Sequence, residues 1–412
     1  MGNKELKKTD PEISRLVEKE AKRQAETLDL IPSENYPSKA VKEALASAFV
    51  SKYSEGRPHK RYYGGMENVD VLEPFVEQRV RQVFRLSAKK WAVNVQPYSG
   101  SPANYAILRG LLNLGDTIMG LALPHGGHLT HGASASLSGK DFKAVQYAVG
   151  KDGFLDYEAI KKLASQAKPK LIICGYTAYP RKIDFKKFRE ISDSVGAYLL
   201  ADISHIAGLI VGRVHPSPFP WADVVMTTTH KTLRGPRGAF IVCREDLREK
   251  IFPKVFPGLQ GGPHNHTIAA IGVALKEAMA PAFKNYARQV VKNAKTLAAE
   301  LKKYNFSLVS GGTDTHLLLI DLTNKNITGK EAQILLEKSG IVCNRNTVPY
   351  DPRSAFDPSG IRLGTPAVTT RGMKEPEMEK IAAFINTVIA NPALALKTNK
   401  EVKNLCRKFP LP

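Results

Sequence analysis

The chain has 412 residues, 43% hydrophobic and 24% charged, which excludes a largely disordered protein because enough apolar side chains are present to build a core. Lysine and arginine number 60 against 39 acidic residues, and the formal net charge of +21 suggests a polyanionic partner such as nucleic acid, or simply solubility. Four cysteines lie far apart in the sequence, which argues against a disulfide scaffold or a thiolate zinc site and predicts a cytoplasmic location.

The N-terminal region is predicted to form a charged amphipathic helix. Asp10, Pro11 and Glu12 supply a capping side chain, a proline at the first helical position and an acidic first turn. The helix is expected to end near Thr27. The polar start of the chain predicts no signal peptide, and the longest apolar run, 197–212, is too short and too polar to span a bilayer.

From about residue 70, short apolar segments alternate with helical ones, which include 102–114 and 185–195. Strands separated by helices predict a largely parallel sheet that is covered on both faces. Such sheets bind their ligands at the carboxyl ends of the strands. The segments predicted to be strands of this sheet are 91–95, 116–121, 171–174, 197–202, 223–228 and 239–243.

A smaller C-terminal α/β domain is predicted to follow a long helical stretch at 267–304. The domain boundary is placed inside this helix, near residue 280. The chain is thereby divided into an N-terminal arm at 1–50, a large domain at 51–280 and a small domain at 281–412. The later elements expected in the small domain are strands at 307–309 and 317–321, a helix at 329–339 and a loop-rich segment to residue 366.

A candidate anion site follows the first predicted strand. Ser99, Gly100 and Ser101 precede a helix whose first position is expected at Pro102. Backbone N–H groups at such a helix start point toward an anion, and the helix dipole favours negative charge. An ordinary serine N-cap explains the pattern equally well. The sequence contains no nucleotide-binding glycine motif, so the phosphate need not belong to a nucleotide.

Three histidines, His125, His128 and His131, follow the second predicted strand. They could bind a metal ion, although no cysteine or acidic residue lies close by in the sequence. Gly126 and Gly127 would let the ring of His128 approach a flat ligand closely. Stacking on a ligand is therefore at least as good an interpretation as metal binding.

Two charged groups follow later strands. Asp202 ends the fourth predicted strand, where a carboxylate can hold a cationic ring nitrogen, and Lys231 follows the fifth. Crowding by Arg234 and Arg237 is expected to depress the pKa of Lys231, which favours Schiff-base chemistry, whereas a lone lysine is ordinarily a solvated surface residue. An anion site, a stacking ring, a carboxylate and a lysine are together what pyridoxal phosphate requires.

Specific motifs are spread over the chain. They are KYSEG at 52–56, KRYYGG at 60–65, HGGHLTHG at 125–132, TTTHKTLRGPRG at 227–238, FPGLQGGP at 256–263, SGGTD at 310–314 and SGIRLGTPA at 359–367. Together, and collinearly from about Leu30, they resemble the serine hydroxymethyltransferase family. The resemblance implies the α/β fold-type I architecture of pyridoxal-phosphate enzymes, with a mostly parallel sheet and a smaller C-terminal domain. It also implies a homodimer or tetramer with shared active sites that reversibly converts L-serine and tetrahydrofolate to glycine and 5,10-methylenetetrahydrofolate.

The resemblance assigns the catalytic roles by matching position. Lys231, with His230 beside it, corresponds to the lysine that binds pyridoxal phosphate covalently. Asp202 would pair with the ring nitrogen and His128 would stack on the ring. Glu55 corresponds to the acid–base glutamate near the substrate hydroxyl and the folate nitrogens. The other residues expected to bind the cofactor are Ser99, Gly100, Ser101, Thr177, His205 and Thr228, together with Tyr53, Gly261 and Gly262, which would reach the cofactor of a partner subunit.

Arg362 corresponds to the arginine that grips the substrate carboxylate, for which its planar fork is suited. The residues expected to bind the amino-acid substrate are Ser33, Glu55, Tyr63, His205 and Arg362. The residues expected to bind folate are Leu123, Gly127, His128, Leu129, Asn346, Ser354, Ala355 and Phe356. No metal ion and no membrane partner is expected.

The sequence departs from the common pattern of the family at Pro32, Arg57, His59 and Ala355, among others. Arg57, for example, stands where the family commonly has tyrosine. Arg57, His59 and Ala355 are expected near the folate and substrate mouth, where they would alter affinity or pterin type. Two alternatives stay open: a pyridoxal-phosphate aldolase of 3-hydroxy amino acids, and a secondary RNA-binding role suggested by the charge, for which no motif is present.

Overall fold

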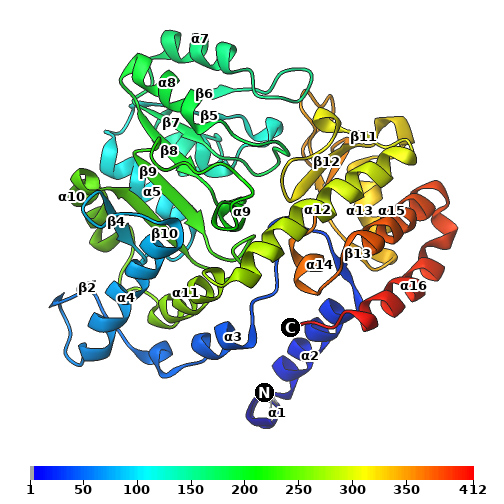
Figure 1. Ribbon diagram of the computed structural model, residues 1–412, viewed down its shortest axis with the longest axis horizontal. Helices are drawn as coiled ribbons and strands as arrows, with labels where there is room; N and C mark the ends of the chain where they lie inside the picture. The colour runs from blue at the N-terminus through cyan, green and yellow to red at the C-terminus, as the bar shows by residue number, and fades with distance from the viewer. Residues whose placement is uncertain (1–3) are drawn as a thin grey trace.

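A seven-stranded sheet forms the centre of the computed structural model, which describes residues 4–412 (Figure 1). In chain order its strands are β4 (Trp91–Asn94), β5 (Thr117–Leu121), β6 (Lys143–Tyr147), β7 (Leu171–Cys174), β8 (Tyr198–Asp202), β9 (Val224–Thr228) and β10 (Ala239–Arg244). They lie in the order β4-β10-β9-β8-β7-β5-β6. Strands β5 to β9 are parallel and β10 is antiparallel to both of its neighbours, so the predicted α/β architecture is confirmed.

All six predicted strands of this sheet are present, and the sequence missed only β6. That strand lies at the edge of the sheet, where Lys143 and Gln146 are exposed and interrupt the apolar run. The helices of this part of the chain are α4 (Glu67–Phe84), α5 (Gly100–Leu111), α6 (Leu137–Lys140), α7 (Tyr157–Ala167), α8 (Phe185–Val195), α9 (Ala207–Val211), α10 (Arg248–Pro253) and α11 (Asn265–Ala278).

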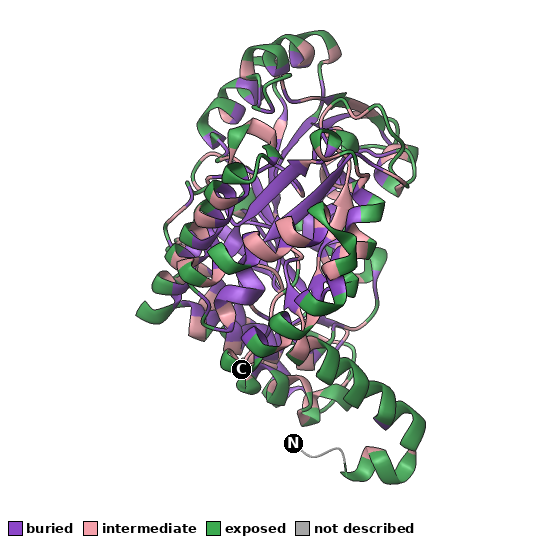
Figure 2. Ribbon diagram, turned by 90° about the vertical axis from the view of Figure 1, so that its right-hand side faces the viewer, coloured by how far each residue is buried: buried purple, intermediate pink, exposed green. Residues whose placement is uncertain are grey.

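Alternate residues of each strand face two separate hydrophobic clusters. Ile172 and Leu199 pack with α4, α7, α8 and α11 on one face, whereas Ile173 and Leu200 pack with α5 and α10 on the other. Both faces are therefore buried, which explains why the strands are continuously apolar (Figure 2). No helix within residues 4–412 is long and apolar enough to cross a membrane.

A second, antiparallel sheet follows in the C-terminal part, with the order β11-β12-β15-β14. Its strands are β11 (Ser307–Leu308), β12 (Leu317–Asp321), β14 (Asn344–Asn346) and β15 (Gly360–Gly364), and its helices are α12 (Pro281–Lys303), α13 (Gly329–Lys338), α14 (Pro366–Thr370), α15 (Glu375–Ala390) and α16 (Ala395–Lys408). The predicted strands at 307–309 and 317–321 are confirmed. The segment before residue 366 was expected to be rich in loops, but it contains the strands β14 and β15 and the short strand at Ile341–Val342. The glycines at both ends of β15 hid it from sequence analysis.

The single long helix expected at 267–304 is wrong, because the chain forms two helices here. α11 ends at Ala278 and α12 begins at Pro281, whose ring cannot continue a preceding helix. The division of the chain at residue 280 stays a prediction.

The predicted N-terminal helix is confirmed as α2 (Pro11–Glu26), and it is preceded by α1 (Lys4–Thr9), which was not predicted. Residues 1–3 of the proposed arm lie outside the described residues. The Asp10 carboxylate accepts a hydrogen bond from the Ile13 amide at 2.9 Å and caps α2. The remaining elements before the first sheet are β1 (Leu28–Asp29), α3 (Lys39–Leu45), β2 (Gly56–Arg57) and β3 (Lys60–Arg61).

Directly after α2, the strand β1 lies in the C-terminal part of the structure. There it pairs in parallel with β13 (Ile341–Val342). Leu28 and Leu30 belong to the hydrophobic cluster of the second sheet. The first strand of the chain therefore belongs to the hydrophobic core of the C-terminal part.

The guanidinium of the buried Arg371 ties the two ends of the chain together. It donates hydrogen bonds to carbonyl oxygens at the C-terminal ends of α2 and α16, where helical carbonyls lack partners. The acceptors are the carbonyls of Gln24, Ala25, Thr27, Cys406 and Phe409.

We expect Arg371→Met to lower the free energy of unfolding by about 3 kcal/mol, because several buried carbonyls lose a charged donor. Urea denaturation measures this change. Arg407→Met is the control, because Arg407 is exposed on α16 and its guanidinium, within the described range 4–412, bonds only the side chain of Asn404. Equal stabilities of the two variants would contradict the prediction.

Candidate active site

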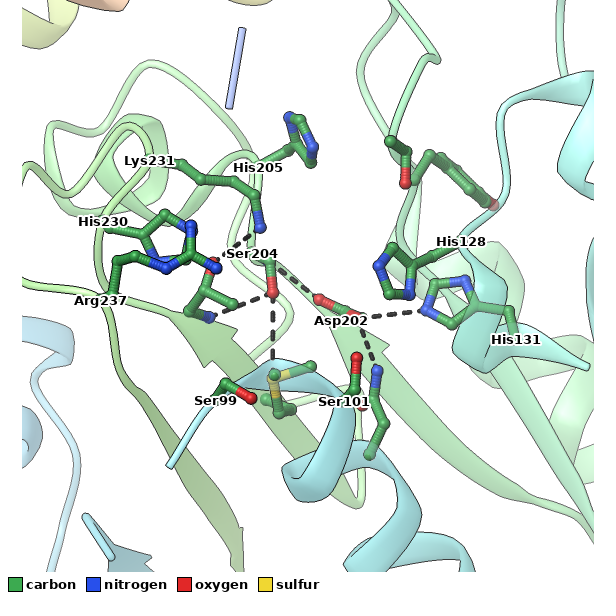
Figure 3. A pocket seen from close by; sticks show the side chains of 16 residues that line it. Ser99, Ser101, His128, His131, Asp202, Ser204, His205, His230, Lys231 and Arg237 are labelled. Carbon is green, nitrogen blue, oxygen red and sulfur yellow. Dashed lines mark hydrogen bonds and ion pairs between the residues drawn. The ribbon is translucent and has the colours of Figure 1, made fainter. Parts of the chain in front are cut away.

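A cavity of about 160 Å³ lies at the carboxyl ends of the parallel strands, where the sequence predicted a ligand. Asp202 is the last residue of β8, and Lys231 follows the end of β9, the neighbouring strand. Both side chains point into the cavity (Figure 3). The predicted residues that line it are Ser99, Gly100, Ser101, His128, Thr177, Asp202, His205, Thr228, His230 and Lys231.

The amino group of Lys231 lies in this cavity and, among residues 4–412, bonds only Thr228, with 2.9 Å between Nζ and Oγ1. Burial lowers its pKa to about 8, and the positive charges of Arg362 and Arg237 act in the same direction. The negative charge of Asp202 opposes this shift. A substantial fraction of the amine is therefore neutral near physiological pH and can attack a carbonyl carbon.

The backbone of Lys231 is held by Asn35, a residue that sequence reasoning missed. The Asn35 amide donates to the Lys231 carbonyl at 2.9 Å and to the Tyr286 hydroxyl at 2.8 Å. Its own oxygen accepts from the Thr370 hydroxyl at 2.7 Å. The guanidinium of Arg234, expected beside the lysine amine, lies over the ring of Tyr286 at 4.7 Å.

The carboxylate of Asp202 receives three hydrogen bonds. They come from Asn104 Nδ2 at 2.9 Å, His131 Nε2 at 3.1 Å and the Ser204 amide at 3.0 Å. Burial alone would raise the pKa of Asp202, but the hydrogen bonds with His131 and Ser204 hold it below the usual range. Asp202 therefore stays ionised in a buried site. Asn104 and Ser204 carry no motif that would have revealed them as its partners.

The ring of His128 is fixed by Thr130. Its Nδ1 accepts from the Thr130 amide at 3.1 Å and lies 2.8 Å from the Thr130 hydroxyl. Burial lowers the pKa of His128 to about 4, so the ring is neutral. His125 packs edge-on against Tyr350 instead, with ring centroids 4.7 Å apart. Nowhere in residues 4–412 do three histidine, cysteine or acidic side chains gather in a way that could hold a metal ion.

The start of α5 distinguishes the two interpretations of the Ser99 segment. The helix begins at Gly100, so the prediction that it begins at Pro102 is wrong by two residues. Ser99 occupies the N-cap position, yet its hydroxyl makes no capping hydrogen bond. A Cβ atom at Gly100 would lie 2.8 Å from Thr228 Cγ2, so the helix start packs directly against β9. This geometry favours an anion cradle over an ordinary cap.

Arg362 is a buried cation on β15. Its Nη1 donates to the Thr177 carbonyl at 2.6 Å and its Nε to Asn344 Oδ1 at 3.2 Å. Burial lowers its pKa to about 10, and within residues 4–412 it forms no ion pair. A buried guanidinium that lacks a carboxylate is suited to bind one from a ligand. A Cβ at Gly364 would lie 2.5 Å from Pro32 Cα, so the turn carrying Ser33 adjoins this strand.

His205 forms an imidazole pair with His316, which sequence reasoning also missed. Nδ1 of His205 lies 3.2 Å from Nε2 of His316, and both rings are buried. Burial lowers the pKa of His316 to about 3 and holds the pKa of His205 well below its usual range, so both rings are neutral. The sequence offered no signal for this contact, because His316 directly precedes β12 in the other sheet.

Glu55 does not line the cavity of Lys231. It lines a separate, open cavity of about 500 Å³ together with Gln260 and Gly261. A Cβ at Gly261 would lie 3.4 Å from Glu55 Oε1, and one at Gly262 would lie 3.1 Å from the Tyr53 ring. The rings of Tyr53 and Tyr63 are 5.1 Å apart. The predicted residues thus fall into two groups, with Glu55, Tyr53, Tyr63, Gly261 and Gly262 in the second.

The predicted folate residues are divided among several places. Thr347, next to Asn346, donates to the Pro124 carbonyl at 3.2 Å, so the segments that carry Asn346 and Leu123 touch. Leu129 lines an apolar cavity of about 440 Å³ beside Ser101. Residues 354–356 lie on an exposed loop, where Phe356 is 81% exposed. Gly127 packs with its α-carbon close to the Leu121 carbonyl, which leaves no room for a side chain.

We expect the amine of Lys231 in the cofactor-free protein to titrate near pH 8 rather than near its ordinary pKa of 10.5. Lysine ¹⁵N NMR would measure the midpoint, with Lys231→Arg to assign the signal. Arg362→Met removes a positive neighbour and should raise the midpoint, whereas Arg407→Met should leave it unchanged. An ordinary lysine midpoint in the unaltered protein would contradict this account of the cavity.

Comparison with known proteins agrees with the geometry. The family described as Serine hydroxymethyltransferase matches residues 6–385. Three proteins named serine hydroxymethyltransferase are each 54% identical to the chain: those of Desulfotalea psychrophila (99% of this chain, 96% of the relative), Sorangium cellulosum (100% and 97%) and Methanosarcina barkeri (98% and 99%). The chain belongs to the serine hydroxymethyltransferase family.

Proposed function

We propose that the cavity of Lys231 and Asp202 is where this pyridoxal-phosphate enzyme interconverts serine and glycine with tetrahydrofolate as co-substrate. The observation that carries the proposal is the pair itself. A partly neutral lysine amine and an ionised carboxylate enter one buried cavity from adjacent strand ends.

The residues of the cavity fit pyridoxal phosphate, which when bound serves as an electron sink for the bond broken at the amino-acid α-carbon. Lys231 would hold it covalently. The start of α5, with the uncapped Ser99 hydroxyl and Thr228, would bind the phosphate. Asp202 would keep a proton on the ring nitrogen, since three donors hold the carboxylate charged. The neutral ring of His128 would stack on the cofactor.

Arg362 would orient the amino acid by gripping its carboxylate, with Ser33 and Tyr63 assisting. The support is that Arg362 is buried and forms no ion pair within residues 4–412. Its Nη1 is fixed by the Thr177 carbonyl and its Nε by Asn344, which leaves Nη2 for a ligand. His205, at the edge of the cavity, would lie near the ring hydroxyl of the cofactor.

Glu55 would move the proton between the substrate hydroxyl and the folate nitrogens. Because Glu55 lies in a second cavity with Gly261, and the paired rings of Tyr53 and Tyr63 adjoin it, we place this group in the active site of a partner subunit. The exposure of Tyr53 and Tyr63, 54% and 45%, supports a surface that a second copy covers. The enzyme would accordingly be a homodimer, or a tetramer of such dimers.

Folate would lie between the two groups, against Leu123, Gly127, His128, Leu129 and Asn346, with the loop of Ser354, Ala355 and Phe356 near its entrance. The support is that the segments of Leu123 and Asn346 touch each other.

A cytoplasmic location completes the proposal. It is supported by four cysteines that are all buried and free, as a reducing compartment would keep them.

Serine cleavage measured with and without tetrahydrofolate tests the function. We expect strong stimulation by tetrahydrofolate and a visible absorption band of the bound cofactor that is lost in Lys231→Ala. Cleavage of serine that does not respond to tetrahydrofolate would favour the aldolase instead.

A hybrid dimer tests the shared site. Lys231→Ala and Glu55→Gln chains, each nearly inactive alone, are co-expressed with different tags and the hybrid is purified. One of its two sites then contains both intact residues, so we expect about half of the wild-type activity per dimer. An inactive hybrid would mean that Glu55 and Lys231 serve the same site from one chain.

A further inference from the structure

Arg57 occupies a position where the sequence departs from its family, and its side chain does not face a ligand cavity. It was expected near the folate and substrate mouth. Instead, Nη1 pairs with Glu73 Oε1 at 2.8 Å and Nη2 with Glu77 Oε1 at 2.6 Å. Both carboxylates lie one turn apart on α4, and the guanidinium lies over the ring of Phe252 at 5.1 Å. Arg57 is therefore clamped against the protein body.

Glu73 is the centre of this clamp, and its side chain is completely buried. Besides Arg57, it accepts from Arg61 Nη2 at 2.9 Å and from Gln96 Nε2 at 3.1 Å and 3.2 Å. One buried carboxylate thus joins two arginines of the β2–β3 hairpin to a polar side chain that follows β4. A buried carboxylate with two arginine partners is stable only while its partners stay in place.

The same network holds the backbone on both sides of Glu55. Arg61 Nη1 donates to the carbonyl of Ser54 at 3.1 Å and to that of Gly56 at 2.8 Å. Gln96 donates to the Gly56 carbonyl as well, at 2.9 Å. The peptide group before Glu55 and the one after Gly56 therefore depend on side chains that Glu73 aligns.

Gly56 leaves this segment little freedom to adjust. It adopts a φ of 98°, and a Cβ there would lie 2.3 Å from the Lys60 carbonyl. Arg57 follows directly and pairs with Lys60 in the hairpin. A shift of Arg57 is therefore transmitted to the peptide of Glu55 rather than absorbed by a loop.

We propose that Arg57 is a positioning residue for Glu55, acting through its clamp between Glu73 and Glu77. The inference rests on the acid–base role proposed for Glu55. Without Arg57, the buried carboxylates of Glu73 and Glu77 would lie one turn apart with no cation between them, and only Arg61 and Gln96 would still join Glu73 to the hairpin. Burial raises the pKa of Glu77 and Arg57 counteracts this shift, so the arginine and Glu77 function as a pair.

The experiment compares Arg57→Met, Glu77→Gln and the double variant in the purified holoenzyme. We expect Arg57→Met to lower kcat of tetrahydrofolate-dependent serine cleavage at least ~10-fold, because a misplaced catalytic group loses most of its effect. The cofactor absorption band and the KM for serine should change little. Adding Glu77→Gln should restore part of the loss by removing the unpaired carboxylate, and Arg57→Lys should retain more activity than Arg57→Met.

The matched control is Arg189→Met. Arg189 also joins two carboxylates, those of Asp193 and Asp223 at 2.9 Å and 2.8 Å, and its side chain is comparably buried. It contacts none of the proposed site residues. We expect it to lose stability as Arg57→Met does while keeping kcat.

Hydrogen–deuterium exchange gives a readout that does not depend on catalysis. The Tyr62 amide donates to the Glu55 carbonyl at 3.2 Å, so its exchange reports on the order of the segment. We expect faster exchange at Tyr62 in Arg57→Met and no change in Arg189→Met. Wild-type kcat and wild-type exchange in Arg57→Met would overturn the inference. If Glu55→Gln keeps its kcat, the acid–base role proposed for Glu55 is wrong. Exchange at the Tyr62 amide in Arg57→Met would still show whether Arg57 orders the segment.

Discussion

The carboxylate of Asp202 and the amino group of Lys231 enter the same buried cavity, and the chemistry of the site depends on their not forming an ion pair. A direct pair would raise the pKa of the lysine and occupy the carboxylate. The structure avoids this by giving each group its own partners: three donors surround Asp202, while Lys231 contacts Thr228. Among the ion pairs within residues 4–412, none joins the two groups. Both the carboxylate and the amino group are therefore kept for a ligand.

The residues that hold Lys231 and Asp202 apart in the cavity come from distant parts of the chain. The turn with Asn35 holds the carbonyl of Lys231, whereas the loop after β5 supplies His131 to Asp202. Arg362 reaches the same region from the second sheet and is tied to it through the Thr177 carbonyl. A site assembled in this way depends on no single loop, and Asn35 and His131 can be altered without removing a residue that we propose to bind a ligand.

The sequence predicted the elements that local chemistry controls. Apolar strand segments, the capping carboxylate of Asp10 and the polar residues after β8 and β9 were all correctly located, because each depends on neighbours along the chain. The edge strand β6 and the glycine-flanked β15 were missed, since their burial is set by tertiary position. Asn104, His316 and Asn35 were missed for the same reason. Their partners lie 98, 111 and 196 residues away in sequence, and no local pattern marks such contacts.

The parallel pairing of β1 with β13 has a consequence for synthesis on the ribosome. Leu28 emerges early, yet its strand partner Ile341 is translated only after the whole first sheet has been made. The first sheet can close its own hydrophobic clusters in the meantime, since Leu28 and Leu30 belong to neither of them. Leu28 and Leu30 of the N-terminal segment therefore stay exposed to solvent until the hydrophobic core of the second sheet has been translated. When the segment docks on that core, it also brings Asn35 to the backbone of Lys231. The contact of Asn35 with Lys231 is in this way postponed until β13 has been translated.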